Sequence, residues 1–419
     1  MNGNSIAQIA AMAKEYKAWM DQFDDMFVGR GNLLKLMRYA LLMRQHILVF
    51  GPPGTSKTQL CDQVFAGIIG APKFATELTA FMTEDGIFGP YNVKLLREQG
   101  ILERNVSGML PQAEFARLGE LLDANPQTLR STLGILNERR MMRGTQQINA
   151  PLFTVYCDTN KDPADYIRRN PDAFAVLDRL LFIAQVGYLK DQKEISEMVK
   201  RHQQGRTKIL SRTISANIIE KLSSFIVLPP GLITDPTIID TFGRAVEEYR
   251  EARRKMSDEE KKAFILPDIS DRRICLASQL LEVEAILNGR VEAKVEDVLA
   301  AVIVICMSEA EHKLWEPIAG EHIEEHKRNA AAQTTTSQGL AIKGLCTQLE
   351  QQVISALAGT PLSEIGHTFQ VLAEQLSLIS PKDPQVQKLY DEAKTKFAGA
   401  LGLLQKRTLN ENGIAKLPF

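Results

Sequence analysis

The segment Gly51-Pro-Pro-Gly-Thr-Ser-Lys-Thr58 contains residue types that bind phosphate. Its glycines let backbone N–H groups surround phosphate oxygens, Lys57 adds a positive charge, and the Thr58 hydroxyl is an oxygen ligand suited to Mg²⁺. The segment follows an apolar run, His46–Phe50, and precedes a helical pattern. Strand, loop and helix in this order are typical of a nucleotide site at a helix N-terminus. We predict that the whole loop binds the nucleotide, namely Gly51, Pro52, Pro53, Gly54, Thr55, Ser56, Lys57 and Thr58.

One position of the loop is unusual, because Ser56 stands where a glycine normally precedes the lysine. Serine is small enough for the turn to be kept. The alternative interpretation is a surface turn rich in glycine and proline that happens to precede Lys57 and Thr58. The apolar strand before the loop and the helix after it favour the phosphate loop.

Further strand-like runs must position this loop. They alternate with helical segments, which is the sequence form of a parallel α/β sheet. With the run before the loop they make five strands, and we predict a five-stranded parallel sheet with helices on both faces. The additional runs are Phe74–Thr79, Ala113–Leu118, Leu152–Cys157 and Leu181–Val186.

After about residue 190 the strand pattern stops and amphipathic helices follow, at 191–203, 213–226, 235–255, 271–287 and 295–310. A polar stretch, Asn329–Gln338, reads as a linker before a helical tail. The tail fits either a small bundle or a set of docking helices. The predicted domains are an N-terminal helix (1–26), a nucleotide-binding domain (27–190), a helical domain (191–328), a linker (329–340) and a helical interaction region (341–419).

The composition argues against several classes of protein. The chain has 50 Lys and Arg against 51 Asp and Glu, so no overall field attracts nucleic acid. Its five cysteines form no CxxC pair, a pattern typical of a reducing compartment. No apolar run approaches the ~20 residues of a membrane span. We therefore expect a cytoplasmic protein with no membrane span and without nucleic acid as its partner.

Three further runs carry a resemblance. Met82-Thr-Glu-Asp-Gly-Ile-Phe-Gly-Pro90, Ala113-Glu-Phe-Ala-Arg-Leu-Gly-Glu-Leu121 and Leu136-Asn-Glu-Arg139, in this order and spacing, resemble the MoxR-like branch of AAA+ ATPases. The resemblance covers about residues 27 to 310. It implies an AAA+ nucleotide-binding domain followed by a helical lid domain, with ATP and Mg²⁺ as cofactors. It also implies a homo-oligomeric ring, expected to be a hexamer, that hydrolyses ATP to remodel or activate a partner protein such as one with a von Willebrand factor A domain.

The same resemblance assigns roles to single residues. Glu120 matches the carboxylate that orients the attacking water, and Asn160 matches the polar residue that senses the γ-phosphate. Arg179 matches the arginine finger that enters the neighbouring subunit's site. Arg272 matches the lid arginine that contacts the nucleotide, with Arg273 as the alternative. Taken alone, such residues more often cap a strand or pair at the surface.

The chain departs from the family at the end of the third strand. An aspartate usually precedes the catalytic glutamate and holds the water shell of Mg²⁺, but Gly119 stands there, and Arg117 replaces an apolar residue. Asp158 lies two residues before Asn160 and therefore on the same face of its strand. Our hypothesis is that Asp158 replaces the missing carboxylate in the space that Gly119 leaves empty, so that Thr58 and Asp158 serve the metal. The alternative is that Asp158 caps a turn.

Gly119 also supports a second function, an ATP-gated scaffold that hydrolyses little and acts through its tail. A DNA-acting motor is disfavoured by the neutral charge. His322-Ile-Glu-Glu-His326 fits a short zinc-protease pattern, which we interpret as a solvated helix face because no third ligand stands out. The cluster of Arg139, Arg140 and Arg143 is assigned by the resemblance to a subunit interface or pore, and a solvated face explains it as well.

Overall fold

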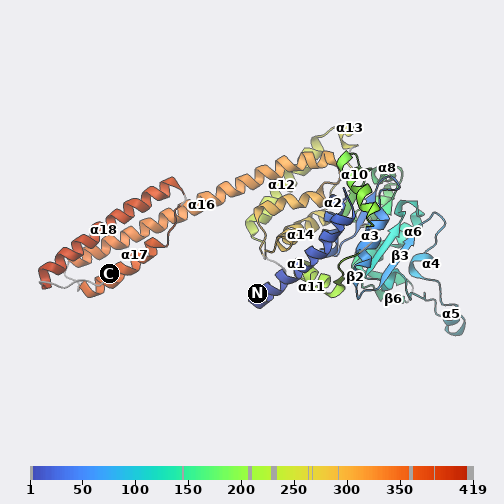
Figure 1. Cartoon of the computed structure of the whole chain (residues 1–419), viewed down its shortest axis with the longest axis horizontal. Coiled ribbons are helices and arrows are strands. Elements are labelled where there is room, and N and C mark those ends of the chain that lie inside the picture. The colour runs from blue at the N-terminus through green and yellow to red at the C-terminus, as the bar shows by residue number, and fades with distance from the viewer. Residues whose placement is uncertain are drawn as a thin grey trace. The chain divides into compact units, whose positions relative to one another are not determined.

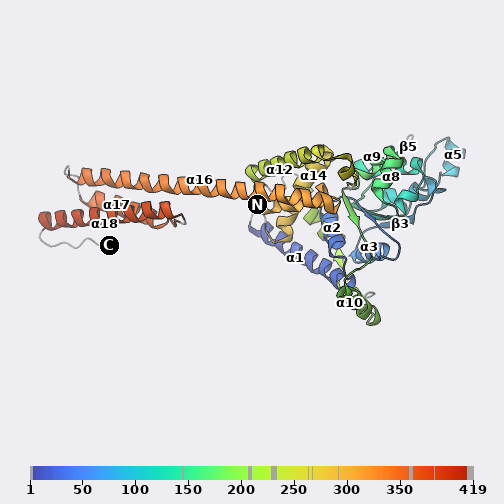
Figure 2. The same cartoon turned by 90° about the horizontal axis from the view of Figure 1, so that it is seen from above.

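The computed structural model describes residues 3–412, apart from 144–145, 206–209, 228–233, 263, 267, 291, 358–361 and 382. The chain divides into two compact units, residues 1–323 and residues 324–419. The first unit contains the sheet and most of the helices, and the second consists of helices alone (Figures 1 and 2). Each unit has an apolar core of its own.

The first unit is built on the predicted five-stranded parallel sheet. Its strand order is β3-β4-β7-β1-β8, and neighbouring strands pair in parallel throughout. The phosphate-loop strand β1 therefore lies between β7 and β8. The bounds are β1 Ile47–Phe50, β3 Lys73–Glu77, β4 Phe115–Gly119, β7 Thr154–Thr159 and β8 Phe182–Gln185.

Side chains alternate between two cores on the two faces of the sheet. Ile47 and Val49 of β1 belong to one core, and Leu48 and Phe50 belong to the other. The first core is completed by α1 (Gly3–Met26), α2 (Gly31–Leu42) and α3 (Lys57–Ala66). Helices on the second face are α4 (Asp85–Phe88), α6 (Pro126–Ser131), α7 (Leu133–Glu138), α8 (Pro163–Arg169) and α9 (Phe174–Leu177).

Short elements complete the sheet domain. The chain forms an antiparallel hairpin, β5 (Arg140–Arg143) with β6 (Gln146–Asn149), and a parallel pair, β2 (Ile68–Ile69) with β9 (Ile214–Ser215). A helix without buried residues, α5, spans Val93–Gln99. The 3₁₀ segments are η1 (Leu110–Gln112), η2 (Leu121–Asp123), η3 (Pro171–Ala173) and η4 (Val295–Ala301).

The helical domain packs on the α1 and α2 face of the sheet and shares its core. A buried ion pair between Arg253 and Glu311, 3.0 Å long, joins α12 to the start of α16. Arg253 also lies 4.5 Å from the centre of the Phe264 ring. The helices are α10 (Gln192–Gln203), α11 (Ala216–Val227), α12 (Pro236–Lys255), α13 (Asp258–Lys261), α14 (Asp271–Leu287), α15 (Val302–Ile305) and α16 (Glu309–Leu357).

The predicted linker, residues 329–340, is helical, because α16 runs through it as one helix. Alanine and glutamine in that stretch are good helix formers, and helices on either side propagate into it more easily than a new helix nucleates. The second unit contains the end of α16 with α17 (Leu362–Ser377) and α18 (Pro384–Asn412), packed around Phe369 and Phe397. None of the described helices is both long and apolar enough to cross a membrane.

A half-buried carboxyl on α14 makes the stability of the first unit depend on pH. Burial raises the pKa of Glu282 from 4.5 to about 7, and a hydrogen bond with Thr234 opposes this rise. Between these values the folded chain keeps a proton that the unfolded chain releases, so the free energy of unfolding falls as pH rises. Glu282→Gln should therefore stabilise the protein by about 1–2 kcal/mol at pH 8 and by much less at pH 4.5. Urea denaturation at the two pH values measures this, and an equal effect at both would contradict it.

Candidate nucleotide-binding site

The predicted phosphate loop joins the carboxyl end of β1 to the first turn of α3. Gly51 has a φ of +148°, and a Cβ there would lie 1.9 Å from the carbonyl oxygen of Val186, so only glycine fits. Ser56 adopts a φ of +63°, the left-handed conformation that explains the usual glycine at this position. The serine is thus accommodated with a backbone strain of about 1 kcal/mol or more.

Lys57 is the centre of the loop's hydrogen bonds. Its side chain is buried, with only 6% of the residue exposed, and its ammonium donates to the carbonyls of Gly51 at 2.8 Å and Pro52 at 2.9 Å. It also donates to Oδ1 of Asn160 at 3.0 Å. Burial lowers the pKa of Lys57, and the negative charges of Asp158 and Glu120 oppose this shift.

Asn160 connects this lysine to Glu120. The amide Nδ2 of Asn160 donates to Oε1 of Glu120 at 2.6 Å, and its backbone N–H donates to Oε2 at 3.3 Å. Glu120 follows β4 directly and has a φ of +52°, which turns the chain sharply at the strand end. Burial raises the pKa of Glu120, as expected for a carboxylate poised to accept a proton. Lys57, Asn160 and Glu120 thus form one continuous network from three segments of the chain.

Thr58 and Asp158 face each other beside this network. Oγ1 of Thr58 lies 3.5 Å from Oδ2 of Asp158, and Asp158 is 3% exposed. Hydroxyl and carboxylate oxygens are the donors that Mg²⁺ prefers, so the pair fits this ion. Among the described residues, no cluster of three or more His, Cys, Asp or Glu side chains forms a complete metal cage. A site of this kind would hold Mg²⁺ through a few protein oxygens, water and phosphate.

The space at Gly119 is filled. The expectation that Gly119 leaves an empty space is therefore wrong. A Cβ on Gly119 would lie 1.8 Å from Oε2 of Glu77 and 2.7 Å from Nη1 of Arg117. The pattern-based reading missed Glu77, because its strand β3 is distant in sequence and meets β4 only through sheet pairing.

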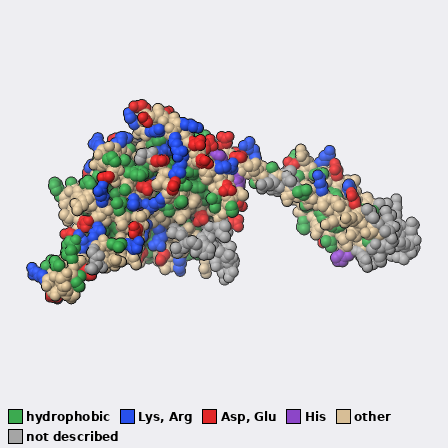
Figure 3. Space-filling model, turned by 180° about the vertical axis from the view of Figure 1, so that it is seen from behind, with side chains coloured by type: hydrophobic (Ala, Val, Ile, Leu, Met, Phe, Trp, Pro, Cys, Tyr) green, Lys and Arg blue, Asp and Glu red, His purple; other side chains and the backbone are tan. Residues whose placement is uncertain are grey.

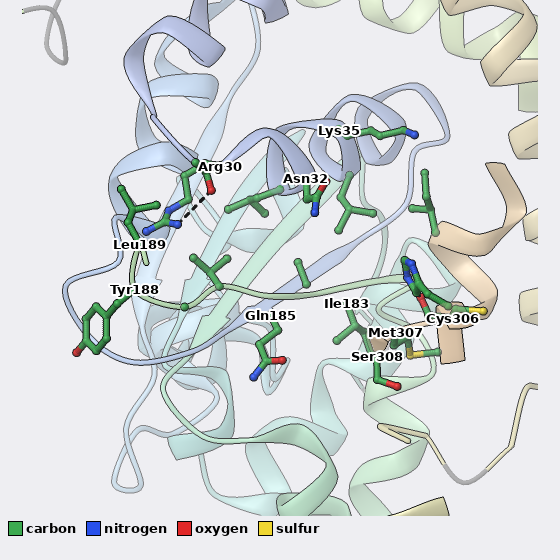
Figure 4. A pocket seen from close by; sticks show the side chains of 18 of the residues that line it. Arg30, Asn32, Lys35, Ile183, Gln185, Tyr188, Leu189, Cys306, Met307 and Ser308 are labelled. Carbon is green, nitrogen blue, oxygen red and sulfur yellow. Dashed lines mark hydrogen bonds between the residues drawn. The ribbon is translucent and has the colours of Figure 1, made fainter. Parts of the chain in front are cut away.

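A cavity of about 850 Å³ adjoins the phosphate loop (Figure 4). Its walls are the start of α2, strand β8 with the residues after it, and the junction of α15 with α16. Two residues of the cavity wall form hydrogen bonds with the phosphate loop. Nε of Arg30 donates to the carbonyl of Thr55, and the Tyr188 hydroxyl donates to the carbonyl of Pro53, both at 3.1 Å. The cavity is large enough for a nucleoside next to the phosphates. Sequence reasoning missed it because its walls come from three distant segments.

The arginines assigned by resemblance lie at the amino ends of the strands, whereas the phosphate loop lies at the carboxyl ends. Arg179 precedes β8, whose first residue pairs with the first residue of β1, so it stands at the amino ends of these strands. Arg272 is half-buried; burial lowers its pKa, with the neighbouring charge of Asp178 opposing and that of Arg179 reinforcing the shift. Within one chain, Arg272 therefore lies away from the phosphate loop at the other end of β1. Its contact with a nucleotide stays a prediction.

Arg273 is structural. It is fully buried, and its guanidinium donates to the carbonyls of Leu180 and Val304, both at 3.2 Å, and of Leu181. Burial lowers its pKa to about 10. The side chain thus fastens α14 to the start of β8 and to α15, which removes it as a nucleotide contact.

Other sequence features take ordinary roles in the structure. Nε2 of His322 lies 2.8 Å from Oε2 of Glu248 on α12, and only 14% of the His322 side chain is exposed. Arg139 is partly buried against the carbonyls of Arg44 and Leu136, and Arg143 pairs with Glu84 at 3.3 Å. On the face shown in Figure 3, basic and acidic side chains are interspersed over the first unit.

The parallel sheet with its phosphate loop, followed by a helical lid, defines a P-loop protein of the AAA+ class. Residues 14–224 match the model of the MoxR domain in MoxR–vWA–beta-propeller ternary systems, and residues 247–316 match an AAA lid domain. The first match covers half of the chain. The chain belongs to the MoxR family of AAA+ ATPases.

Individual relatives agree with this assignment. An uncharacterized protein of Methanocaldococcus jannaschii is 28% identical over 277 residues, which are 66% of each chain. The chaperone MoxR1 of Mycobacterium tuberculosis is 27% identical over 168 residues, 40% of this chain and 43% of the relative. The solved structure of a candidate ATPase from Cytophaga hutchinsonii shares the fold with a TM-score of 0.56 at 16% identity, over 78% of this chain and 97% of that one. The alignments thus span at most 66% of these two curated relatives.

The two neighbouring arginines should differ sharply in their effect on stability. Arg273→Met leaves buried carbonyls without a donor and should lower the free energy of unfolding by about 3 kcal/mol or more. Arg272→Met is the matched control and should change it by less than about 1 kcal/mol. Equilibrium denaturation of both variants measures the difference. Equal losses would mean that Arg273 does not fasten the lid.

Proposed function

We propose that the protein is an ATP hydrolase that assembles into a ring, a hexamer by family resemblance, and remodels or activates a partner protein. The observation that carries this proposal is the network of Lys57, Asn160 and Glu120 beside the Thr58 and Asp158 pair. It combines a cation for the phosphates, a polar sensor and a carboxylate for water at one strand edge. The adjoining cavity offers the space for the nucleoside.

The network suggests how binding prepares the catalytic carboxylate. Phosphate oxygens would compete with Asn160 for the ammonium of Lys57, because both are acceptors for the same donor. Asn160 would then be free to meet the terminal phosphate, and its hold on Glu120 would change. Glu120, with a pKa raised by burial, would orient and deprotonate the attacking water. Mg²⁺, when bound at Thr58 and Asp158, would neutralise the phosphate charge.

The position of Arg179 and Arg272 supports assembly. Both lie at the amino ends of the strands, away from the phosphate loop of their own chain. An arginine finger acts on charge that develops at the nucleotide, so these side chains would need a neighbouring subunit's site. A ring of subunits in which this surface meets the next phosphate loop supplies such a site.

The partner that we propose is a protein with a von Willebrand factor A domain. The support is the matched family model, which describes MoxR domains in systems with such proteins. Exposed Phe81, with 95% of its surface accessible, and the helical second unit are the segments that we propose to contact it. Co-purification of the protein with the product of an adjacent gene that encodes such a domain tests the proposal. Its absence from the purified complex would contradict it.

An ATP-gated scaffold is the second candidate, favoured by Gly119. This function would use nucleotide binding to set the oligomeric state and would need no turnover. Two measurements separate the candidates, namely the rate of phosphate release and the mass of the assembly with and without ATP. Assembly that responds to ATP without phosphate release would favour the scaffold.

Lys57→Ala should weaken ATP binding by about 10- to 100-fold, because a charge-assisted hydrogen bond to phosphate contributes about 1.5–3 kcal/mol. Calorimetric titration with ATP measures the affinity. Lys14→Ala, at an exposed position of α1, is the control and should bind as the parent does. Tight ATP binding by Lys57→Ala would refute the phosphate-loop assignment.

Arg179→Ala should leave ATP binding within about twofold of the parent and lower the turnover rate by ~100-fold or more, because a finger stabilises charge that forms only in the transition state. Glu120→Gln should also be inactive. Mixing the two variants should restore part of the activity, since some interfaces then combine an intact Arg179 with an intact Glu120. Light scattering verifies that both assemble. Normal assembly without restored activity would place the finger elsewhere.

A further inference from the structure

Three residues form a row across the carboxyl edge of the sheet. Glu77 at the end of β3 pairs with Gly119 at the end of β4. Leu118 pairs with Cys157, so Asp158 of β7 is the next neighbour of Gly119. In-register residues of parallel strands point to the same face, and here that face is covered by α3. Thr58 is in the first turn of this helix.

Gly119 leaves room for the side chain of Glu77 between Glu77 and Asp158. Because glycine has no side chain, the carboxylate of Glu77 can reach over β4 toward Asp158. Its Oε2 lies 1.8 Å from the position that a Cβ on residue 119 would take. The carboxylate of Glu77 therefore occupies the place where the side chain of the usual aspartate would begin. Gly119 and Glu77 are a coupled pair, because any larger residue at 119 would displace Glu77.

Arg117 holds Glu77 in this place. It is two residues before Gly119 and so lies on the same face of β4. Its Nη1 donates to Oε1 of Glu77 at 2.6 Å, and its Nε donates to Oδ1 of Asp62 on α3 at 3.1 Å. Nη1 also lies 3.9 Å from Oδ2 of Asp158. A planar guanidinium fixes both the distance and the direction of a carboxylate, which a flexible ammonium does less well.

The charges around Thr58 suit a divalent cation. Four carboxylates stand against three cations, and a metal would balance this excess of negative charge. The carboxylates are Asp62, Glu77, Asp158 and Glu120, and the cations are Arg30, Lys57 and Arg117. The carboxylates of Glu77 and Asp158 carry like charge on the same face of the sheet and therefore repel each other. A cation shared by them would relieve this repulsion.

We propose that Glu77 is the carboxylate that this site uses in place of an acid at position 119. Together with Asp158 it binds the water shell of Mg²⁺ beside Thr58, and Arg117 is its positioning residue. The proposal rests on the proposed nucleotide-binding function, because Thr58 and the phosphates supply the remaining oxygens. It makes Gly119 part of a rearranged metal site and not the mark of a lost one.

The first test measures metal affinity without using turnover. Glu77→Gln keeps the shape and the hydrogen bond from Arg117 but removes the charge. It should weaken Mg²⁺ binding by about 10-fold, the effect expected for a residue that holds a metal's outer shell. The readouts are the Mg²⁺ dependence of ADP affinity and the binding of Mn²⁺ followed by electron paramagnetic resonance. ADP affinity in excess chelator should stay within about twofold. Glu15→Gln on the exposed side of α1 is the matched control.

Two further variants test the coupling with Gly119. Gly119→Asp alone should collide with Glu77 and Arg117 and gain no Mg²⁺ affinity. Glu77→Ala/Gly119→Asp should bind Mg²⁺ within about threefold of the parent, because the new acid can then occupy the vacated place. Thermal melting verifies that each variant is folded. Arg117→Lys tests positioning, and its Mg²⁺ affinity should lie between those of the parent and Glu77→Gln.

The outcomes separate this proposal from the proposed function. A parent that binds ADP with Mg²⁺, and a folded Glu77→Gln that binds Mg²⁺ equally well, would overturn the role of Glu77 and leave the nucleotide site standing. Gly119→Asp that gains Mg²⁺ affinity with Glu77 in place would overturn it as well. A parent that binds no nucleotide even with Mg²⁺ would overturn both.

Discussion

The buried ammonium of Lys57 is the constraint on which the site depends. An ammonium that is largely removed from water needs hydrogen-bond acceptors on every side. The chain supplies them from the loop itself, through Gly51 and Pro52, and from the residue that follows β7, Asn160. The same need positions Glu120, because the asparagine that accepts from the lysine donates to that carboxylate.

Side chains alternate between the two faces of each strand. At the strand ends this alternation separates the polar residues of the site from the apolar residues of the core. At the carboxyl edge, side chains on the α3 face are polar, among them Asp158 and Arg117, while their neighbours Cys157 and Leu118 point into the opposite core. At the amino edge, the burial of Arg273 is used for fastening the lid. Buried charged groups therefore serve two different purposes in one sheet. Their position relative to the strand ends, and not their burial alone, distinguishes a site from a structural anchor.

The sequence was sufficient for the parts that depend on local order. The phosphate loop follows from a buried strand, a run of small residues and a helix, and the five strands follow from apolar runs. The sequence did not predict contacts between neighbouring strands, or contacts at the amino ends of the strands. Glu77 meets Gly119 only through strand pairing, and nothing near either residue in the sequence indicates it. Arg272 and Arg273 are adjacent in sequence, and only their packing shows that one is a structural anchor.

The structure also changes the meaning of the Gly119 substitution. In the sequence it reads as the loss of a carboxylate from a catalytic motif, which favours a scaffold without turnover. In the fold, a neighbouring strand brings the Glu77 carboxylate to the same place, and the Arg117 side chain that accompanies the substitution binds it. A glycine and an arginine that are each unusual alone are thus consistent with each other, because Gly119 makes room and Arg117 supplies the opposite charge. Two departures that compensate physically argue for a site that keeps its charge balance.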